Sequence, residues 1–274
     1  MEQVRYVIKF SFDGNSFRGY ARQPEGGTVE DELIDALRTS KIIDDVNIGN
    51  FASASRVDRG VSAIGAAAAF DTQVDPRRVL RSLNAHSWNV IAHSIASVDG
   101  SFDPRRQADS RWYRYHFREE GLPSGLDVPL MREAALLFLG EHDLSAFAKV
   151  DGRNPTRMVQ RIALERQNGS LVLDVWGASF LWNQVRRMAS ALLMVGTHEV
   201  APEEISDALE TGMSRPFPPA PPKGLFLMDV IYDGIEFERV SDLPSGTTEH
   251  LRDEYHQKRC SLKYLEYMRE RIRF

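Results

Sequence analysis

One short stretch of the chain, SASRVDRGVSA at residues 53–63, places a single carboxylate, Asp58, between two guanidinium groups, Arg56 and Arg59. A carboxylate close to opposite charges is held in its ionised form. An ionised aspartate is a poor general acid, but it suits work as a nucleophile or an electrostatic stabiliser. Gly60 opens backbone conformations that other residues avoid. The plainer interpretation of the same pattern is a loop salt bridge beside a structural glycine.

Two further stretches combine aromatic rings with arginine, which is the composition used to stack bases and bind phosphate. FDGNSFRGYARQP at 12–24 contains Arg22, and SRWYRYHF at 110–117 contains Arg111 and Tyr113. Strand alternation puts Arg111 and Tyr113 on one face of a sheet. Tyrosines half-buried in a sheet are the plainer interpretation of the second stretch.

A fourth stretch, ASFLWNQVRRMAS at 178–190, sets Arg186 among apolar residues of an expected helix. A guanidinium on a largely apolar helix needs a partner. The ionised Asp58 would serve, so we expect these two side chains to meet.

In this order, the stretches resemble the tRNA pseudouridine synthase A family. SRVDRGVSA resembles the family signature GRTDxGVHA, and FDGNSFRGYARQP resembles YDGxxFxGWQxQP. FDPRRQADSRWYRY resembles the segment ending in ARxYxY, ASFLWNQVRRM the helix ending in FLxxMVR, and GLFLMDVIY the closing strand. The resemblance covers about residues 4–232. The aspartate motif is highly specific, and the other segments are moderately so.

The resemblance implies an RNA isomerase that detaches uracil from its ribose, rotates it and rejoins it through C5, giving pseudouridine. It implies that Asp58 is the essential aspartate and that Arg186 is the arginine that pairs with it. It implies that Tyr113 stacks on the base and helps to remove the C5 proton, and that Arg56 lies near the substrate. The implied substrate is the tRNA anticodon stem-loop, at positions 38–40, bound by a homodimer.

The chain also departs from the family pattern inside these motifs. Ser55, Val57 and Ser62 stand where the family has Gly, Thr and His, and Tyr20 stands for Trp. None of these changes removes an ionisable group from the catalytic trio. They put the loop geometry and the RNA contacts in doubt and mark a divergent member.

A target base stacked in an RNA helix must leave the stack, which costs a few kcal/mol. Residues that fill the vacated space or hold phosphates would offset that cost. The expected substrate and RNA contacts are Tyr20, Arg22, Arg56, Arg59, Asn84, Arg105, Arg106 and Arg111, with Arg77 and Arg78 as additional phosphate candidates.

Net charge alone argues weakly against a nucleic-acid partner, because the 274 residues sum to −5. That excess lies entirely in residues 191–274, which hold 10 basic and 15 acidic side chains, whereas residues 1–190 hold 24 of each. Clustered arginines in the neutral part can still make a local positive field for RNA. Ion-paired helix and strand surfaces are the plainer interpretation of any one cluster.

Composition excludes several other classes. No window of about 18 apolar residues suggests a membrane span, and the N-terminus lacks the apolar core of a signal peptide. A single cysteine, Cys260, cannot form an internal disulfide, so we expect a cytoplasmic, reduced protein. No cofactor is expected, because neither GxGxxG nor GxxxxGK[ST] occurs. No metal is expected either, since the EHD at 141–143 has no companion ligand motif.

Hydrophobic periodicity predicts an α+β protein. Strands are expected at 3–12, 47–54, 63–71, 89–98, 111–118, 157–167, 170–177 and 224–232, and helices at 28–40, 75–86, 129–140, 179–200, 202–212 and 246–274. The order β-α-β-β-α-β occurs twice, which indicates two ferredoxin-like halves whose sheets line a shared central cleft. We expect an N-terminal half at 1–102, a C-terminal half at 103–235 and a charged helical tail at 236–274.

Two other function classes stay open from the residues alone. A catalytically silent RNA-binding protein could use the sheets as stacking platforms, although Asp58 and Arg186 would then have no task. A metabolic enzyme could bind a small anion with its arginines. RNA binding that weakens steeply with salt would separate the last class from the others.

Overall fold

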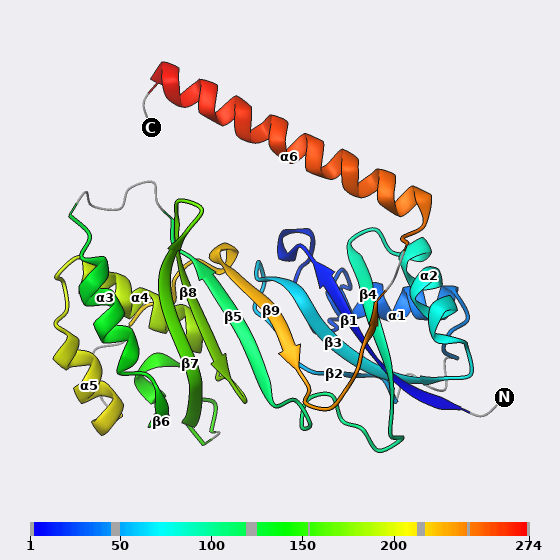
Figure 1. Ribbon diagram of the computed structural model, residues 1–274, viewed down its shortest axis with the longest axis horizontal. Coiled ribbons are helices and arrows are strands. Elements are labelled where there is room, and N and C mark those ends of the chain that lie inside the picture. Colours follow the sequence, from blue (N-terminus) through cyan, green and yellow to red (C-terminus); the bar gives the residue numbers. More distant parts are fainter. Residues whose placement is uncertain are drawn as a thin grey trace.

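A computed structural model describes residues 3–44, 50–118, 125–152, 154–212, 217–239 and 242–272. Within these ranges, ten strands form one mixed sheet that runs the length of the molecule (Figure 1). The strands are β1 Val4–Phe12, β2 Ala52–Ser53, β3 Ser62–Thr72, β4 Val90–Val98, β5 Ser110–His116, β6 Gly140–Asp143, β7 Thr156–Gln167, β8 Ser170–Gly177, β9 Leu225–Ile231 and β10 Glu238–Arg239. The helices are α1 Val29–Thr39, α2 Pro76–His86, α3 Val128–Leu136, α4 Gln184–Gly196, α5 Pro202–Thr211 and α6 Ser245–Ile272, with short 3-10 turns η1 Gly14–Ser16, η3 Ser145–Phe147 and η4 Pro222–Gly224.

The N-terminal half follows the predicted order β1-α1-β2-β3-α2-β4, and its strands lie in the spatial order β4-β1-β3, with β2 paired to β3. Both helices begin where the sequence predicts. Thr28 and Asp31 form a capping box for α1, and Asp75 caps α2 just before Pro76. These caps satisfy backbone N–H groups that have no partner inside the helix.

The C-terminal half repeats this arrangement with β5, α3, β7, β8, α4 and β9, in the spatial order β9-β5-β8-β7. The strand β6 is an addition at the outer edge of β7. Two ferredoxin-like strand orders are therefore present, and the α+β prediction is confirmed.

The two sheets are joined edge to edge, which the sequence did not predict. Strand β3 pairs with β2 near its C-terminal end and with β9 near its N-terminal end. Across this junction, register aligns Phe12 with Ala63, Ala63 with Leu227, and Leu227 with Tyr113. Tyr113 thus lies only two strands from β3, the strand that follows the Asp58 loop.

Three predicted elements have different bounds. The strand expected at 47–54 is confined to β2, and residues 47–49 lie outside the described residues. The helix expected at 129–140 ends at Leu136, and Gly140, with φ +100°, begins β6. The helix expected at 179–200 starts only at Gln184, after a left-handed residue at Asn183.

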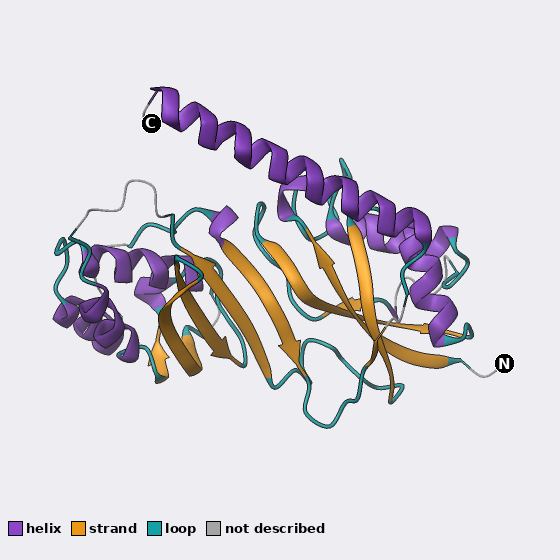
Figure 2. Ribbon diagram, turned by 45° about the horizontal axis from the view of Figure 1, so that its top comes forward, coloured by secondary structure: helices purple, strands orange, loops and turns teal. Residues whose placement is uncertain are grey.

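Helix α6 confirms the expected C-terminal helix and lies along one edge of the molecule, as two views show (Figure 1 and Figure 2). Its first turn is tied to α2, since Thr247 Oγ1 donates to the Asn84 carbonyl oxygen at 2.6 Å. Further along, the Lys258 ammonium pairs with Asp13 at 2.7 Å. The short strand β10, from the segment that precedes α6, pairs with β4, so part of that segment extends the sheet of the N-terminal half.

No helix among the described residues is long and apolar enough to cross a membrane. The predicted domain limits at 102 and 235 are not tested by this arrangement and stay predictions.

Candidate active site

Asp58 lies in the loop between β2 and β3, beside the junction of the two halves. The loop closes as a tight turn in which the Val61 N–H donates to the Asp58 carbonyl oxygen at 3.0 Å. Gly60 has φ +86°, a conformation that favours glycine, as the motif predicts. Ser62, which stands where the family signature has His, accepts a hydrogen bond from the Gly14 N–H at 3.0 Å. The turn therefore presents Asp58 from a fixed backbone.

Arg186 reaches Asp58 from the first turn of α4, as expected. Its Nη1 donates to Asp58 Oδ2 at 2.7 Å, across 128 residues of sequence. The side chains of Arg186 and Asp58 are 13% and 24% exposed, so the pair is shielded but reachable. Among the described residues, no donor reaches Asp58 Oδ1 and no acceptor takes Arg186 Nη2. Within the described part of the chain, each member of the pair thus keeps one polar atom without a partner.

Two other acceptors hold the same guanidinium. Arg186 Nε donates to the Ala220 carbonyl oxygen at 2.6 Å, and Nη1 also donates to Asn183 Oδ1 at 2.8 Å. The Ala220 N–H in turn donates to the Arg186 carbonyl oxygen at 3.0 Å. Residues 217–222, with the sequence FPPAPP, contain Ala220 and therefore form a wall of the site. A Cβ on Gly60 would lie 3.3 Å from Pro222 of this segment.

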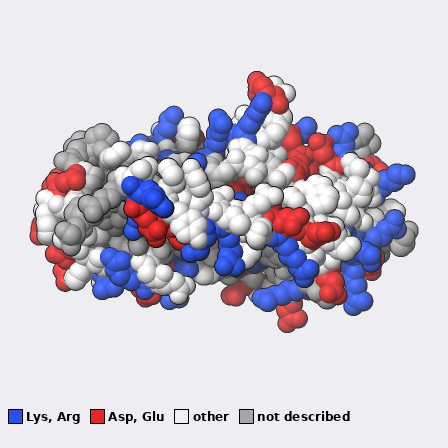
Figure 3. All heavy atoms as spheres, turned by 90° about the horizontal axis from the view of Figure 1, so that it is seen from above, with Lys and Arg blue, Asp and Glu red and all other residues white. Residues whose placement is uncertain are grey.

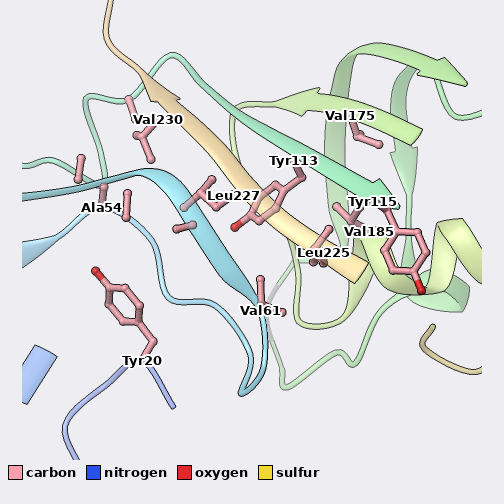
Figure 4. Packing of buried hydrophobic residues seen from close by; sticks show 14 of the residues in the cluster. Tyr20, Ala54, Val61, Tyr113, Tyr115, Val175, Val185, Leu225, Leu227 and Val230 are labelled. Carbon is pink, nitrogen blue, oxygen red and sulfur yellow. The ribbon is translucent and has the colours of Figure 1, made fainter. Parts of the chain in front are cut away.

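Tyr113 lies on the helix-covered face of β5 and extends toward Leu227 and β3 (Figure 4). Its ring meets Phe180 edge-on, with centroids 5.1 Å apart. Burial raises the pKa of Tyr113 to about 12; the negative charge of Asp58 acts in the same direction, and the positive charge of Arg111 opposes it. The phenol is therefore neutral at physiological pH. Tyr113 and Arg111 share one face of β5, as strand alternation predicted.

Arg111 is buried, with 5% of its surface exposed, and is used by the protein itself. Its Nη2 donates to the carbonyl oxygens of Ala54 and Arg105, and its Nη1 to those of Ala108 and Ala178. Its Nε donates to Ser55 Oγ at 3.4 Å. No N–H group is left for a phosphate. Arg111 instead fixes the strand end that leads into the Asp58 loop.

Tyr20 and Asn84 are also inside the protein. Asn84 exchanges two 2.8 Å hydrogen bonds with the backbone of Ala92, one from its Nδ2 and one to its Oδ1, which ties α2 to β4. Tyr20 packs on Phe12 with ring centroids 5.9 Å apart, and its hydroxyl is buried. Burial raises the pKa of Tyr20. Neither side chain reaches the surface at which we expected it to contact RNA.

The remaining predicted contacts are exposed arginines. They are Arg22, Arg56, Arg59, Arg77, Arg78, Arg105 and Arg106. Arg56 and Arg59 flank Asp58 in its loop. Arg22 pairs with Asp31 at 3.1 Å, so part of its charge is already balanced. Basic and acidic groups are interspersed on the face seen in Figure 3, without a large patch of one sign.

Sequence reasoning missed two groups that hold Arg186, namely Asn183 and the Ala220 carbonyl oxygen. A backbone carbonyl cannot be recognised from the sequence. Asn183 could have been weakly indicated, because asparagine tolerates the left-handed conformation that ends an extended segment. Within the residues that the structure describes, no three His, Cys, Asp or Glu side chains gather as metal ligands.

Known proteins are similar in sequence to this chain over most of its length. A family model described as tRNA pseudouridine synthase matches residues 134–233. The tRNA pseudouridine synthase A of Pyrococcus furiosus is 41% identical over 238 residues, which is 86% of each chain. That of Pyrococcus abyssi is 42% identical over 237 residues, covering 85% of this chain and 87% of its own. That of Methanosphaerula palustris is 41% identical over 229 residues, covering 83% and 80%.

Proposed function

Because the chain belongs to the tRNA pseudouridine synthase A family, we propose that it isomerises uridine to pseudouridine in tRNA. The observation that carries this proposal is the ion pair of Asp58 and Arg186, whose carboxylate is close enough to the buried Tyr113 to act on its pKa. The pair is assembled from both halves of the protein, at the junction of their sheets. Asp58 Oδ1 and Arg186 Nη2, which have no partner among the residues that the structure describes, would be available to a substrate.

We propose the anticodon stem-loop, at positions 38–40, as the substrate within the tRNA. A uridine there must leave its stack to reach Asp58. The exposed Arg56 and Arg59 flank Asp58 in its loop, and the exposed Arg105 and Arg106 lie in the segment between β4 and β5. These four arginines are the candidates to bind the phosphates on either side of the everted nucleotide. Arg111, Tyr20 and Asn84 act from inside the fold and are not part of this contact set.

In the proposed reaction, Asp58 acts on the everted nucleotide as an ionised carboxylate. Three first steps suit it: attack on ribose C1′ with departure of uracil, addition to uracil C6, or removal of the 2′ proton to give a glycal. In each, uracil separates from C1′, turns, and bonds through C5, after which the C5 proton leaves. Arg186 orients Asp58 through the bond from its Nη1 to Asp58 Oδ2. The ring of Tyr113 supports the base, and the charge of Asp58 is near enough to help raise the pKa of this tyrosine.

Removal of the carboxylate tests all three routes together. Asp58→Asn should bind tRNA with unchanged affinity and form no pseudouridine. A carbodiimide probe that blocks primer extension at pseudouridine detects the product, and its stop should fall on the 3′ side of the anticodon stem-loop. Appreciable product from Asp58→Asn contradicts the assignment of Asp58. Wild-type protein that binds tRNA but leaves it unchanged would favour the silent RNA-binding protein instead.

We also propose a homodimer, with one tRNA lying across both subunits. The support is that the face of a single chain seen in Figure 3 has interspersed charge without a large basic patch, so a second copy would supply further arginines to a long RNA. Light scattering at micromolar concentration tests it, and a mass of one chain with and without tRNA contradicts it. The cytoplasmic location expected from the sequence stays a prediction.

A further inference from the structure

Asn183 occupies a position that costs stability, at the N-terminus of α4. It has φ +65° and ψ +5°, the left-handed conformation, which is uncommon for any residue other than glycine. Such conformations persist where the surroundings impose them, and they gather at functional sites. The residue lies three positions before Arg186, so its side chain faces the same turn of the helix.

The side chain of Asn183 does not do what an asparagine at this position ordinarily does. An N-cap asparagine accepts a hydrogen bond from a backbone N–H of the first turn. Asn183 makes no such bond. Gln184 closes the turn instead, because its Oε1 accepts from the Leu181 N–H at 2.9 Å. Asn183 Oδ1 accepts from Arg186 Nη1 at 2.8 Å.

The same nitrogen, Arg186 Nη1, donates to Asp58 Oδ2 at 2.7 Å. Asn183 therefore acts on the ion pair rather than on the helix. Arg186 Nε donates to the Ala220 carbonyl oxygen at 2.6 Å, and Nη1 donates to Asn183. Two of the three guanidinium nitrogens are therefore held even without the bond to Asp58. The guanidinium plane cannot rotate without loss of one of these bonds, and Nη2 has no partner in the described ranges of the chain.

We infer that Asn183 is a positioning residue, which holds the Arg186 guanidinium so that Asp58 is engaged through one oxygen only. The other oxygen, Oδ1, is then presented to the everted uridine. The kinetic part of this inference rests on the proposed function. The hold on Arg186 does not, and it can be measured in the protein without RNA.

Three substitutions separate the hydrogen bond from the backbone conformation. Asn183→Gly accepts φ +65° without a Cβ and removes the amide. Asn183→Ala removes the amide and is strained. Asn183→Asp keeps an acceptor oxygen and tolerates the left-handed conformation. Asn168→Gly is the matched control, because Asn168 is also left-handed, with φ +52°, and lies in the β7–β8 hairpin.

The two readouts should rank the variants differently. Asn183→Gly should melt within about 2 °C of wild type while kcat falls about tenfold, the loss of one charge-assisted hydrogen bond, with KM for tRNA unchanged. Asn183→Ala should lose both stability and kcat. Asn183→Asp should keep kcat within about threefold of wild type. Asn168→Gly should change neither. If kcat instead follows melting temperature through the series, or Asn183→Gly keeps full kcat, the inference is overturned.

Arginine-selective 15N NMR of the free protein supplies the readout without RNA, with the Arg186 signals assigned by their loss in Arg186→Lys. Restricted rotation should give separate Hη resonances in wild type. Asn183→Gly keeps the bonds to Ala220 and Asp58 but loses the third, so its Hη resonances should broaden and merge at a lower temperature. An equal merging temperature in the two proteins overturns the inference. If the Hη resonances differ in this way between wild type and Asn183→Gly but wild type makes no pseudouridine, the proposed function fails while the hold of Asn183 on Arg186 stands.

Discussion

The ion pair between Asp58 and Arg186 should contribute to folding as well as to chemistry, and its strength can be worked out from the structure. The perturbation is a double-mutant cycle with Asp58→Asn, Arg186→Gln and the double variant. Each single change also disturbs other partners, since Arg186 donates to the Ala220 carbonyl oxygen and to Asn183. The cycle cancels those losses and isolates the pair.

Charges whose nearest atoms are 2.7 Å apart attract by about 6 kcal/mol at an effective dielectric constant of 20. Desolvation offsets most of this for a shielded pair. Because the two side chains are 13% and 24% exposed, we expect a net value typical of a hydrogen bond between charged groups, about 2 kcal/mol. The unfolding free energies of the four proteins, measured in urea at pH 7, should show this coupling.

A second cycle on Asp103 and Arg106 is the control. These side chains are 45% and 87% exposed and approach only to 3.7 Å, so their coupling should be below about 0.5 kcal/mol. A value that small for Asp58 and Arg186 would refute the reasoning, because the two groups would then not be paired in solution. Raised salt should weaken the control pair proportionally more than the shielded one.

Four further predictions address residues of the site and of the sheet junction. Burial raises the pKa of Tyr113 from 10.0 to about 12. The neutral phenol therefore contributes fully to the unfolding free energy below pH 10, and this contribution is lost as pH rises through 12. Between pH 9 and 11, the unfolding free energy measured in urea should fall by about 1 kcal/mol more for wild type than for Tyr113→Phe. Arg111→Met should lower the unfolding free energy by about 3 kcal/mol because it leaves buried carbonyl oxygens unpaired, whereas Arg105→Ala should keep stability and weaken tRNA binding in a filter assay. Gly65→Ala should lower the melting temperature, because its Cβ would lie 2.7 Å from the Met228 carbonyl oxygen at the sheet junction. Stability equal to wild type would contradict the predictions for Arg111→Met and Gly65→Ala. An equal fall in the unfolding free energy of wild type and Tyr113→Phe between pH 9 and 11 would contradict the prediction for Tyr113.

Patterns that repeat along the chain were enough to predict most of the fold. Period-two alternation located β5 and the face that carries Tyr113, and capping residues such as Thr28 and Asp75 located the helix starts. The partner of Arg186 was also predictable, because a cation in an apolar helix requires an opposite charge. These inferences use local chemistry, which the sequence states directly.

The rest depends on contacts between distant segments. The burial of Arg111 could not be foreseen, since four of its five partners are backbone carbonyl oxygens, which every residue possesses. Its position on the same strand face as Tyr113 suggested a surface role to sequence reasoning, and the interior role follows only from the fold. The late start of α4 has the same origin, because helix propensity does not report that Asn183 is held in a left-handed conformation by tertiary contacts.

The shared strand β3 has a mechanical consequence. Backbone hydrogen bonds link it to β9 of the other half, with Ser62 opposite Phe226 and Ala63 opposite Leu227, directly after the Asp58 loop. A hinge between the halves would have to break these bonds next to the ion pair that the halves build together. This pairing therefore favours a rigid connection between the halves beside Asp58, and under the proposed function the RNA would have to change its shape to bring a uridine to this carboxylate.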